Sequence, residues 1–165
     1  MFIFSRYQKY LAGIILLSIL TACGFHVRGS NNAPISFQSI YLEPITSPLN
    51  IELKRYLGND VQFVESAKDA QIILEIINET RNRNVLSVNN QGRVREYTLM
   101  YSVKFKIKNN QNIELIPPSE INLQRNVSYD DTQALAKERE ETFLYRDMQS
   151  DAVQQVARRL SMLKP

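Results

Sequence analysis

The sequence predicts an α+β domain: a mixed, mostly antiparallel sheet of about four or five strands, with two helices packed on one face. Residues 96–108 alternate between polar and apolar side chains, as a strand does when one face is buried and the other is wet. Residues 71–78, QIILEIIN, are strongly apolar and predict a central strand. Residues 144–163 carry apolar side chains three and four positions apart, which predicts a helix packed against the sheet.

The first elements predicted along the domain are a strand, a helix and a second strand. Residues 37–42, FQSIYL, form a short apolar run. Ser47 suits the N-cap of a helix whose first position is Pro48. Leucines then recur at helical spacing until Gly58, a typical helix stop. A brief strand is expected at 61–64.

A long two-stranded arm is predicted in the middle of the chain. The apolar strand 71–78 continues into a polar stretch, 79–88, that is rich in arginine and asparagine. Residues 89–92, NNQG, are a turn signal. The alternating strand follows directly, so the two strands are expected to pair across this turn.

The last two elements predicted are a strand and a long helix. After a turn at 109–112, residues 121–129 alternate again, with Arg125 breaking the apolar set. Asp130 can cap the final helix, with Gln133 as its capping-box partner. The apolar stripe of that helix indicates core packing and not a cofactor site; it comprises Leu144, Met148, Ala152, Val156, Leu160 and Leu163.

The N-terminus is typical of a secretory signal peptide, residues 1–22. Arg6 and Lys9 precede the apolar run 11–20, which is about half of the roughly 20 residues that a membrane-spanning helix requires. The chain has a single cysteine, Cys23, so an internal disulfide is excluded. Its place after the cleavage site indicates another role.

Leu20-Thr21-Ala22-Cys23 resembles the signal of bacterial lipoproteins. That resemblance implies a diacylglycerol and an N-acyl chain on Cys23, which would be the only attached groups, with no other cofactor. Several acyl chains hold a protein on a membrane without a spanning helix. Gly24 in place of aspartate implies sorting to the outer membrane in enteric-type bacteria. Residues 23–36 are predicted to be a tether, and residues 37–165 a single domain.

Composition excludes several classes of function. Removal of residues 1–22 takes away two of the 20 basic residues and none of the 17 acidic ones, so the net charge falls from +3 to about +1. Bulk charge therefore does not favour nucleic-acid binding. The one histidine, His26, lies next to the anchor, which argues against a metal cluster or a Ser-His-Asp site. We predict no enzyme and no catalytic residues.

Four arginines are candidates for binding an anionic group. Arg81 and Arg83 precede the predicted hairpin turn, and Arg93 and Arg95 follow it. Guanidinium forks suit phosphate and carboxylate groups. Charges that protect an exposed strand end from aggregation are an equally good explanation.

Three stretches resemble the LPS-assembly lipoprotein family LptE. They are CGFHVR at 23–28, GRVREYTLM at 92–100 and ALAKE at 134–138, followed by an amphipathic closing helix. The resemblance implies a lipoprotein on the periplasmic face of the outer membrane, which plugs the β-barrel protein LptD and helps it to assemble. Together the two proteins would insert lipopolysaccharide into the outer leaflet.

The same resemblance implies direct lipopolysaccharide binding through basic residues. Lys137 matches one basic position of the family. The other falls near Asn90, so Arg93 and Arg95 are candidates to supply its charge. The expected partners are LptD, lipopolysaccharide and the membrane, with no nucleic acid. Two alternatives stay open: a periplasm-facing lipoprotein that binds another envelope ligand, such as peptidoglycan, and a hydrolase that uses a carboxylate pair.

Overall fold

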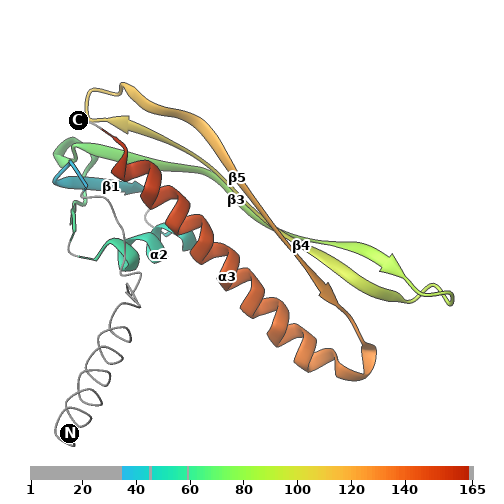
Figure 1. Ribbon diagram of the computed structural model, residues 1–165. Coiled ribbons are helices and arrows are strands. Elements are labelled where there is room, and N and C mark those ends of the chain that lie inside the picture. Colours follow the sequence, from blue (N-terminus) through green and yellow to red (C-terminus); the bar gives the residue numbers. More distant parts are fainter. Residues whose placement is uncertain (1–34, 45, 59, 164–165) are drawn as a thin grey trace, which may run out of the picture. The chain divides into compact units, whose positions relative to one another are not determined.

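The computed structural model describes residues 35–44, 46–58 and 60–163 (Figure 1). The predicted signal peptide, the lipid attachment site Cys23, His26 and nearly all of the predicted tether lie outside these residues. The expectations attached to them therefore stay predictions.

The described part of the chain forms a five-stranded mixed sheet in the order β2-β1-β3-β4-β5. The short strands β1 (Ser39–Glu43) and β2 (Gln62–Phe63) are parallel, and β1 is also parallel to β3 (Ile72–Val88). β3, β4 (Val94–Asn109) and β5 (Glu114–Ser128) are antiparallel neighbours. The predicted α+β class and the mostly antiparallel sheet are confirmed.

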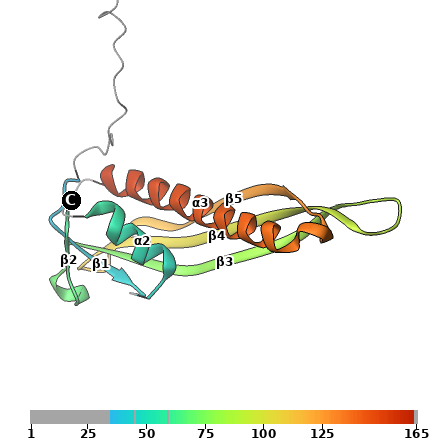
Figure 2. The same ribbon diagram turned by 90° about the horizontal axis from the view of Figure 1, so that it is seen from below.

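Two helices, α2 (Pro48–Leu57) and α3 (Ala134–Ser161), lie on the same side of the sheet (Figure 2). Leu49, Leu53 and Leu57 of α2 are buried in the core. α2 ends at Gly58, whose φ of +53° is readily adopted only by glycine. The predicted bounds of this helix are confirmed.

Most of the predicted stripe on α3 is also buried. Met148, Ala152, Val156 and Leu160 are fully enclosed between α3 and the sheet. Asp130 caps a short 3₁₀ turn, Asp131–Gln133, by accepting from the backbone N–H and the hydroxyl of Thr132. It does not cap α3 itself, because α3 begins only after this turn, with Gln133 at its N-cap; the predicted cap was placed one turn too early.

β4 has the predicted alternation. Its apolar residues Leu99, Tyr101, Val103, Phe105 and Ile107 are fully buried under the helices. β5 begins at Glu114, earlier than the predicted 121, and includes two prolines. Proline is tolerated there because β5 is an edge strand, and the register shifts between Phe105 and Ile107 of β4, opposite them.

A bulge in β3 decides which of its polar side chains face the helices. Ile72, Leu74 and Ile76 are buried on the helix side. The register then shifts between Ile76 and Asn78. Since the side-chain period of a strand is two residues, one extra residue turns the odd-numbered positions toward the helices.

Neither α2 nor α3, the two α-helices of the described residues, lies on the other side of the sheet (Figure 2). We call the part of that side formed by the middle of β3, β4 and β5 the open face. It alternates with the buried residues of β4 and comprises Thr80, Asn82, Asn84, Thr98, Met100, Ser102, Asn122, Gln124 and Asn126.

Candidate functional site

A groove of about 440 Å³ lies between the first turns of α3 and the strands beneath it. We call it the cationic groove, because Arg81, Arg83 and Lys137 all line it. Glu138 and Glu141 line it too, so the groove carries three cations and two carboxylates. Its other lining residues are Tyr97, Val127, Ser128, Tyr129, Ala134, Leu135, Thr142 and Tyr145.

Arg81 faces the groove because of the bulge in β3. Its guanidinium lies over two aromatic rings, 5.7 Å from the ring centre of Tyr101 and 5.6 Å from that of Tyr145. It also donates a hydrogen bond of 2.9 Å to the side-chain oxygen of Gln149 on α3. Cation–π contacts hold such a guanidinium in place while leaving part of its donor edge free.

Arg83 lies two residues further along the same face of β3. Its Nη1 is 3.0 Å from a carboxylate oxygen of Glu141, and its guanidinium is 4.6 Å from the ring centre of Tyr97. The hydrogen bond that Arg83 donates to Glu141 raises the pKa of Arg83 above its ordinary value. The side chain is nevertheless 48% exposed, so it is accessible from the groove.

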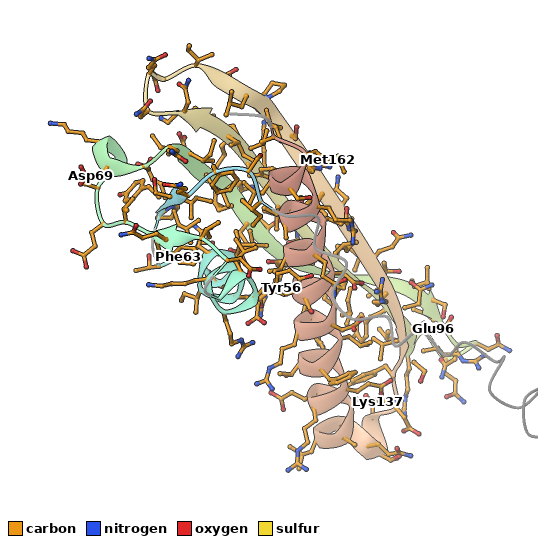
Figure 3. The ribbon with its side chains drawn as sticks, turned by 60° about the vertical axis from the view of Figure 1, so that its left-hand side comes forward. Tyr56, Phe63, Asp69, Glu96, Lys137 and Met162 are labelled. Carbon is orange, nitrogen blue, oxygen red and sulfur yellow. The ribbon has the colours of Figure 1, made fainter. Side chains whose placement is uncertain are left out.

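Lys137 approaches the same groove from the beginning of α3, at the opposite end of this helix from Met162 (Figure 3). Its Nζ donates to the hydroxyl of Ser128, at the end of β5, and to the carboxylate of Glu140, both at 2.9 Å. The ammonium therefore links the helix to the sheet at the groove's rim.

Arg93 and Arg95 do not line this groove. Arg93 lies in the turn between β3 and β4, and Arg95 is an exposed residue of β4. The hairpin tip extends past the first turn of α3 (Figures 1 and 2). The four arginines grouped by the sequence therefore belong to two places: one pair, Arg81 and Arg83, lines the groove, and the other pair lies near the hairpin tip.

The tyrosines of the groove are functional candidates that the sequence analysis did not single out. The rings of Tyr97 and Tyr129 meet edge to face, with centres 5.3 Å apart. The hydroxyl of Tyr145 donates to the backbone oxygen of Asn82 at 2.8 Å. Partial burial, and then the nearby Glu141 carboxylate, raise the pKa of Tyr145. The sequence did contain a signal for two of them: Tyr97 lies two positions from the apolar Leu99, and Tyr129 two positions from the apolar Val127, which places each pair on the same side of the sheet.

A polar network next to the groove joins β3 to β4 and to the start of α2. Glu79, half-buried on β3, accepts hydrogen bonds from the hydroxyl of Tyr101 at 2.6 Å and from the hydroxyl of Ser47 at 2.7 Å. It also accepts from the backbone N–H of Leu49, in the first turn of α2, at 3.3 Å. Ser47 stands at the predicted N-cap position, but the carboxylate of Glu79 takes over the capping bond.

Arg125, which interrupts the apolar pattern of β5, has a structural partner outside the groove. Its Nη2 lies 2.7 Å from the carboxylate of Asp151 and 3.3 Å from that of Asp147, both on α3. It therefore ties the sheet edge to the helix, and it is no ligand candidate.

Within residues 35–44, 46–58 and 60–163, no group of three or more His, Cys, Asp or Glu side chains could hold a metal ion. None of the helices described there is long and apolar enough to cross a bilayer. The chemistry available in the groove is electrostatic and hydrogen-bonding recognition of an anion beside aromatic and aliphatic surface.

Sequence comparison identifies related proteins along nearly the whole chain. Residues 37–160 match the family profile described as LptE, Lipopolysaccharide-assembly. An LPS-assembly lipoprotein LptE of Pectobacterium atrosepticum is 26% identical, with 94% of this chain and 86% of that protein aligned. The protein of the same name from Yersinia pestis is 30% identical, over 94% of this chain and 75% of that one.

Solved structures share the fold. Lipoprotein B from Nitrosomonas europaea has a TM-score of 0.72 and 35% identity, covering 84% of this chain and 90% of that one. A minor lipoprotein from Acinetobacter baumannii has a TM-score of 0.59 and 26% identity, covering 79% and 98%. Together with the family match over the sheet and both helices, these similarities show that the chain belongs to the LptE family of lipopolysaccharide-assembly lipoproteins.

Proposed function

We propose that this protein is a lipid-anchored outer-membrane lipoprotein that plugs the LptD β-barrel, helps it to assemble and binds the lipopolysaccharide that the pair inserts into the outer leaflet. Family membership supports the role in lipopolysaccharide assembly. The observation that carries ligand binding is the cationic groove, where three cations lie beside tyrosine rings and Leu135. Such a combination suits a phosphorylated amphiphile.

The cations of the groove can exchange their present partners for a phosphate. Exposed ion pairs contribute only about 0–1 kcal/mol, so moving Arg83 away from Glu141 costs little. A phosphate offers several strong acceptor oxygens to a guanidinium fork. Glu138 and Glu141 oppose an anion, so they limit the affinity and allow release. Release matters for a protein that passes lipopolysaccharide onward.

The exposed pair at the hairpin tip would make a second point of contact. Arg93 and Arg95 lie beyond the groove on the same arm. A lipopolysaccharide molecule carries anionic groups on both its lipid and its core sugars, so it can meet two separate cationic points. In this proposal the protein acts by binding and assembly, without turnover.

Membrane attachment would come from Cys23. Two or more acyl chains there would anchor the protein stably, since each buried methylene contributes about 0.8 kcal/mol. The working domain would then remain on the periplasmic face.

Co-purification tests the barrel partnership. The tagged full-length protein would be co-expressed with LptD of the same organism and purified from detergent-solubilised outer membranes. We expect LptD at a near-equal molar amount. Recovery of the lipoprotein without LptD would contradict the proposed partnership.

Ligand binding would be tested separately with purified lipopolysaccharide and the immobilised protein. Lys137→Gln, and Arg93→Gln with Arg95→Gln, should each weaken binding several-fold. Glu141→Gln should strengthen it, because it frees Arg83 and removes a negative charge from the groove. Lys68→Gln, on the exposed 3₁₀ turn Ala67–Asp69, is the matched control. Unchanged binding in all folded groove and tip variants would rule out this site.

A further inference from the structure

The open face is uncharged over three consecutive rows of paired residues. Asn82, Met100 and Gln124 form the middle row across β3, β4 and β5. Asn84, Thr98 and Asn126 form the row nearer the hairpin tip. The third row, on the side of the middle row away from the hairpin tip, consists of Thr80, Ser102 and Asn122.

This neutrality is local to the open face. The next row toward the base of the sheet pairs Lys104 with Glu120, and Glu96 lies at the other end. On the opposite side of the sheet, α3 is rich in charge, beginning with KEREE at 137–141. Charge is therefore concentrated in the helix layer and at the two ends of the open face.

A sheet face that remains in water normally carries charged side chains, which keep it soluble and prevent association. Charge is depleted instead where a surface becomes the centre of a protein contact, because desolvating an unpaired charge is expensive. Amides and hydroxyls are compatible with such a contact, since each can both donate and accept a hydrogen bond.

Part of this hydrogen-bonding capacity is unused within the protein. Thr98 donates to Asn126 at 3.0 Å, and Asn84 donates to the sulfur of Met100 at 3.3 Å. The side chains of Asn82 and Gln124 are exposed and make no hydrogen bond within the described part of the chain. They are available to a partner at the centre of the face.

We propose that the open face is the surface through which this protein contacts the inner wall of the LptD barrel. The inference rests on the proposed function and adds the surface that makes the contact. The inner wall of an outer-membrane barrel is polar, and its inward side chains alternate along strands spaced about 4.8 Å apart, as do those of the open face. Lipopolysaccharide is excluded as the occupant because it is a polyanion and these three rows carry no cation.

Charge insertion at the centre of the face provides the test. Asn82→Lys with Gln124→Lys, and Asn82→Glu with Gln124→Glu, would each be introduced into the full-length protein co-expressed with LptD. We expect both double variants to reduce the recovered LptD at least tenfold. Both signs should act alike, because the cost is the burial of an unpaired charge and not repulsion from a particular one.

Two controls separate the contact from folding and from general charge. Asn82→Thr with Gln124→Thr keeps the face neutral and should retain LptD, since threonine suits a strand. Asn110→Lys with Gln111→Lys adds the same two charges at exposed amides in the β4–β5 turn and should also retain it. All variants should keep the wild-type unfolding midpoint and lipopolysaccharide binding.

The outcomes distinguish this surface from the function on which it rests. If the wild type recovers LptD and either charged variant recovers it equally, the contact lies elsewhere and the proposal is overturned. If the wild type alone forms a dimer by light scattering that both charged variants abolish, the occupant is a second copy and the proposal is wrong. If the wild type recovers no LptD, the proposed function itself fails.

Discussion

Removing the carboxylate of Glu79 should destabilise the domain more than any other single change at a partly exposed position of β3. Glu79 accepts from Tyr101, Ser47 and the N-terminus of α2. The side chain of Tyr101 is fully buried, so Glu79→Ala leaves its hydroxyl without an acceptor. A hydrogen bond to a charged group contributes about 1.5–3 kcal/mol and a helix cap about 1 kcal/mol, so the expected loss is about 2.5–4 kcal/mol.

Urea denaturation at pH 7, followed by circular dichroism, measures this loss directly. For a domain of this size the corresponding drop in Tm is about 10 °C. Glu79→Gln keeps one acceptor oxygen and should lose about half as much stability. Combining Glu79→Ala with Tyr101→Phe removes the orphaned hydroxyl, so the double variant should lose about 1 kcal/mol less than the sum of the two single variants. A Glu79→Ala loss below about 0.5 kcal/mol would refute the reasoning.

Three other predictions concern titration, the core and the anchor. Burial, and then the hydrogen bond to Glu79, raise the pKa of Tyr101. The contribution of Tyr101 to stability is therefore fully present below about pH 10 and falls at higher pH, where the tyrosine of the unfolded chain ionises first. Urea denaturation from pH 8 to 11 should show that the free energy of unfolding declines less steeply in Tyr101→Phe than in the wild type. Met148→Ala opens a cavity at a fully buried position and should cost about 2–5 kcal/mol in the same assay, whereas Met162→Ala, at a position 73% exposed, should be nearly neutral. Cys23→Ala should abolish acylation in mass spectra of the mature N-terminus while leaving the Tm of the domain unchanged; an unmodified Cys23 thiol in the mature wild type would contradict the lipoprotein prediction.

Periodicity predicted the elements whose apolar positions face one core. The alternation of β4 and the apolar stripe of α3 were assigned correctly because burial alone selects those residues. The helix α2 was placed correctly because proline and glycine mark its two ends. Such signals are local, so one sequence suffices to read them.

The bulge in β3 could not be predicted in the same way. Without it, Asn82 and Asn84 would face the helices and Arg81 and Arg83 would lie on the open face. Nothing local in QIILEIINETRNRN marks the extra residue, since it is selected by pairing with β4 and by the partners that α3 supplies. The sequence therefore identified the four arginines as candidates, but it did not predict that two of them line the groove and two lie near the hairpin tip.

The sequence shows that Arg125 interrupts the apolar pattern of its strand, but only the structure shows why. It occupies an inward position of β5 because Asp147 and Asp151, spaced one helical turn apart on α3, receive its guanidinium. A cation at an apolar position, with a pair of acids four residues apart elsewhere in the chain, is a combination that a sequence offers many times over. Only the packing of α3 on β5 selects this one.

The bulge also has a consequence for the proposed function, because it sorts the polar residues of one strand onto two surfaces. It turns the guanidinium groups of Arg81 and Arg83 into the groove with Lys137, and it turns the amides of Asn82 and Asn84 onto the neutral open face. A polyanionic ligand is attracted to the first surface, while a polar protein wall can cover the second without burying a charge. In the proposed function, ligand binding and partner binding would use opposite sides of the same sheet, so neither would have to displace the other.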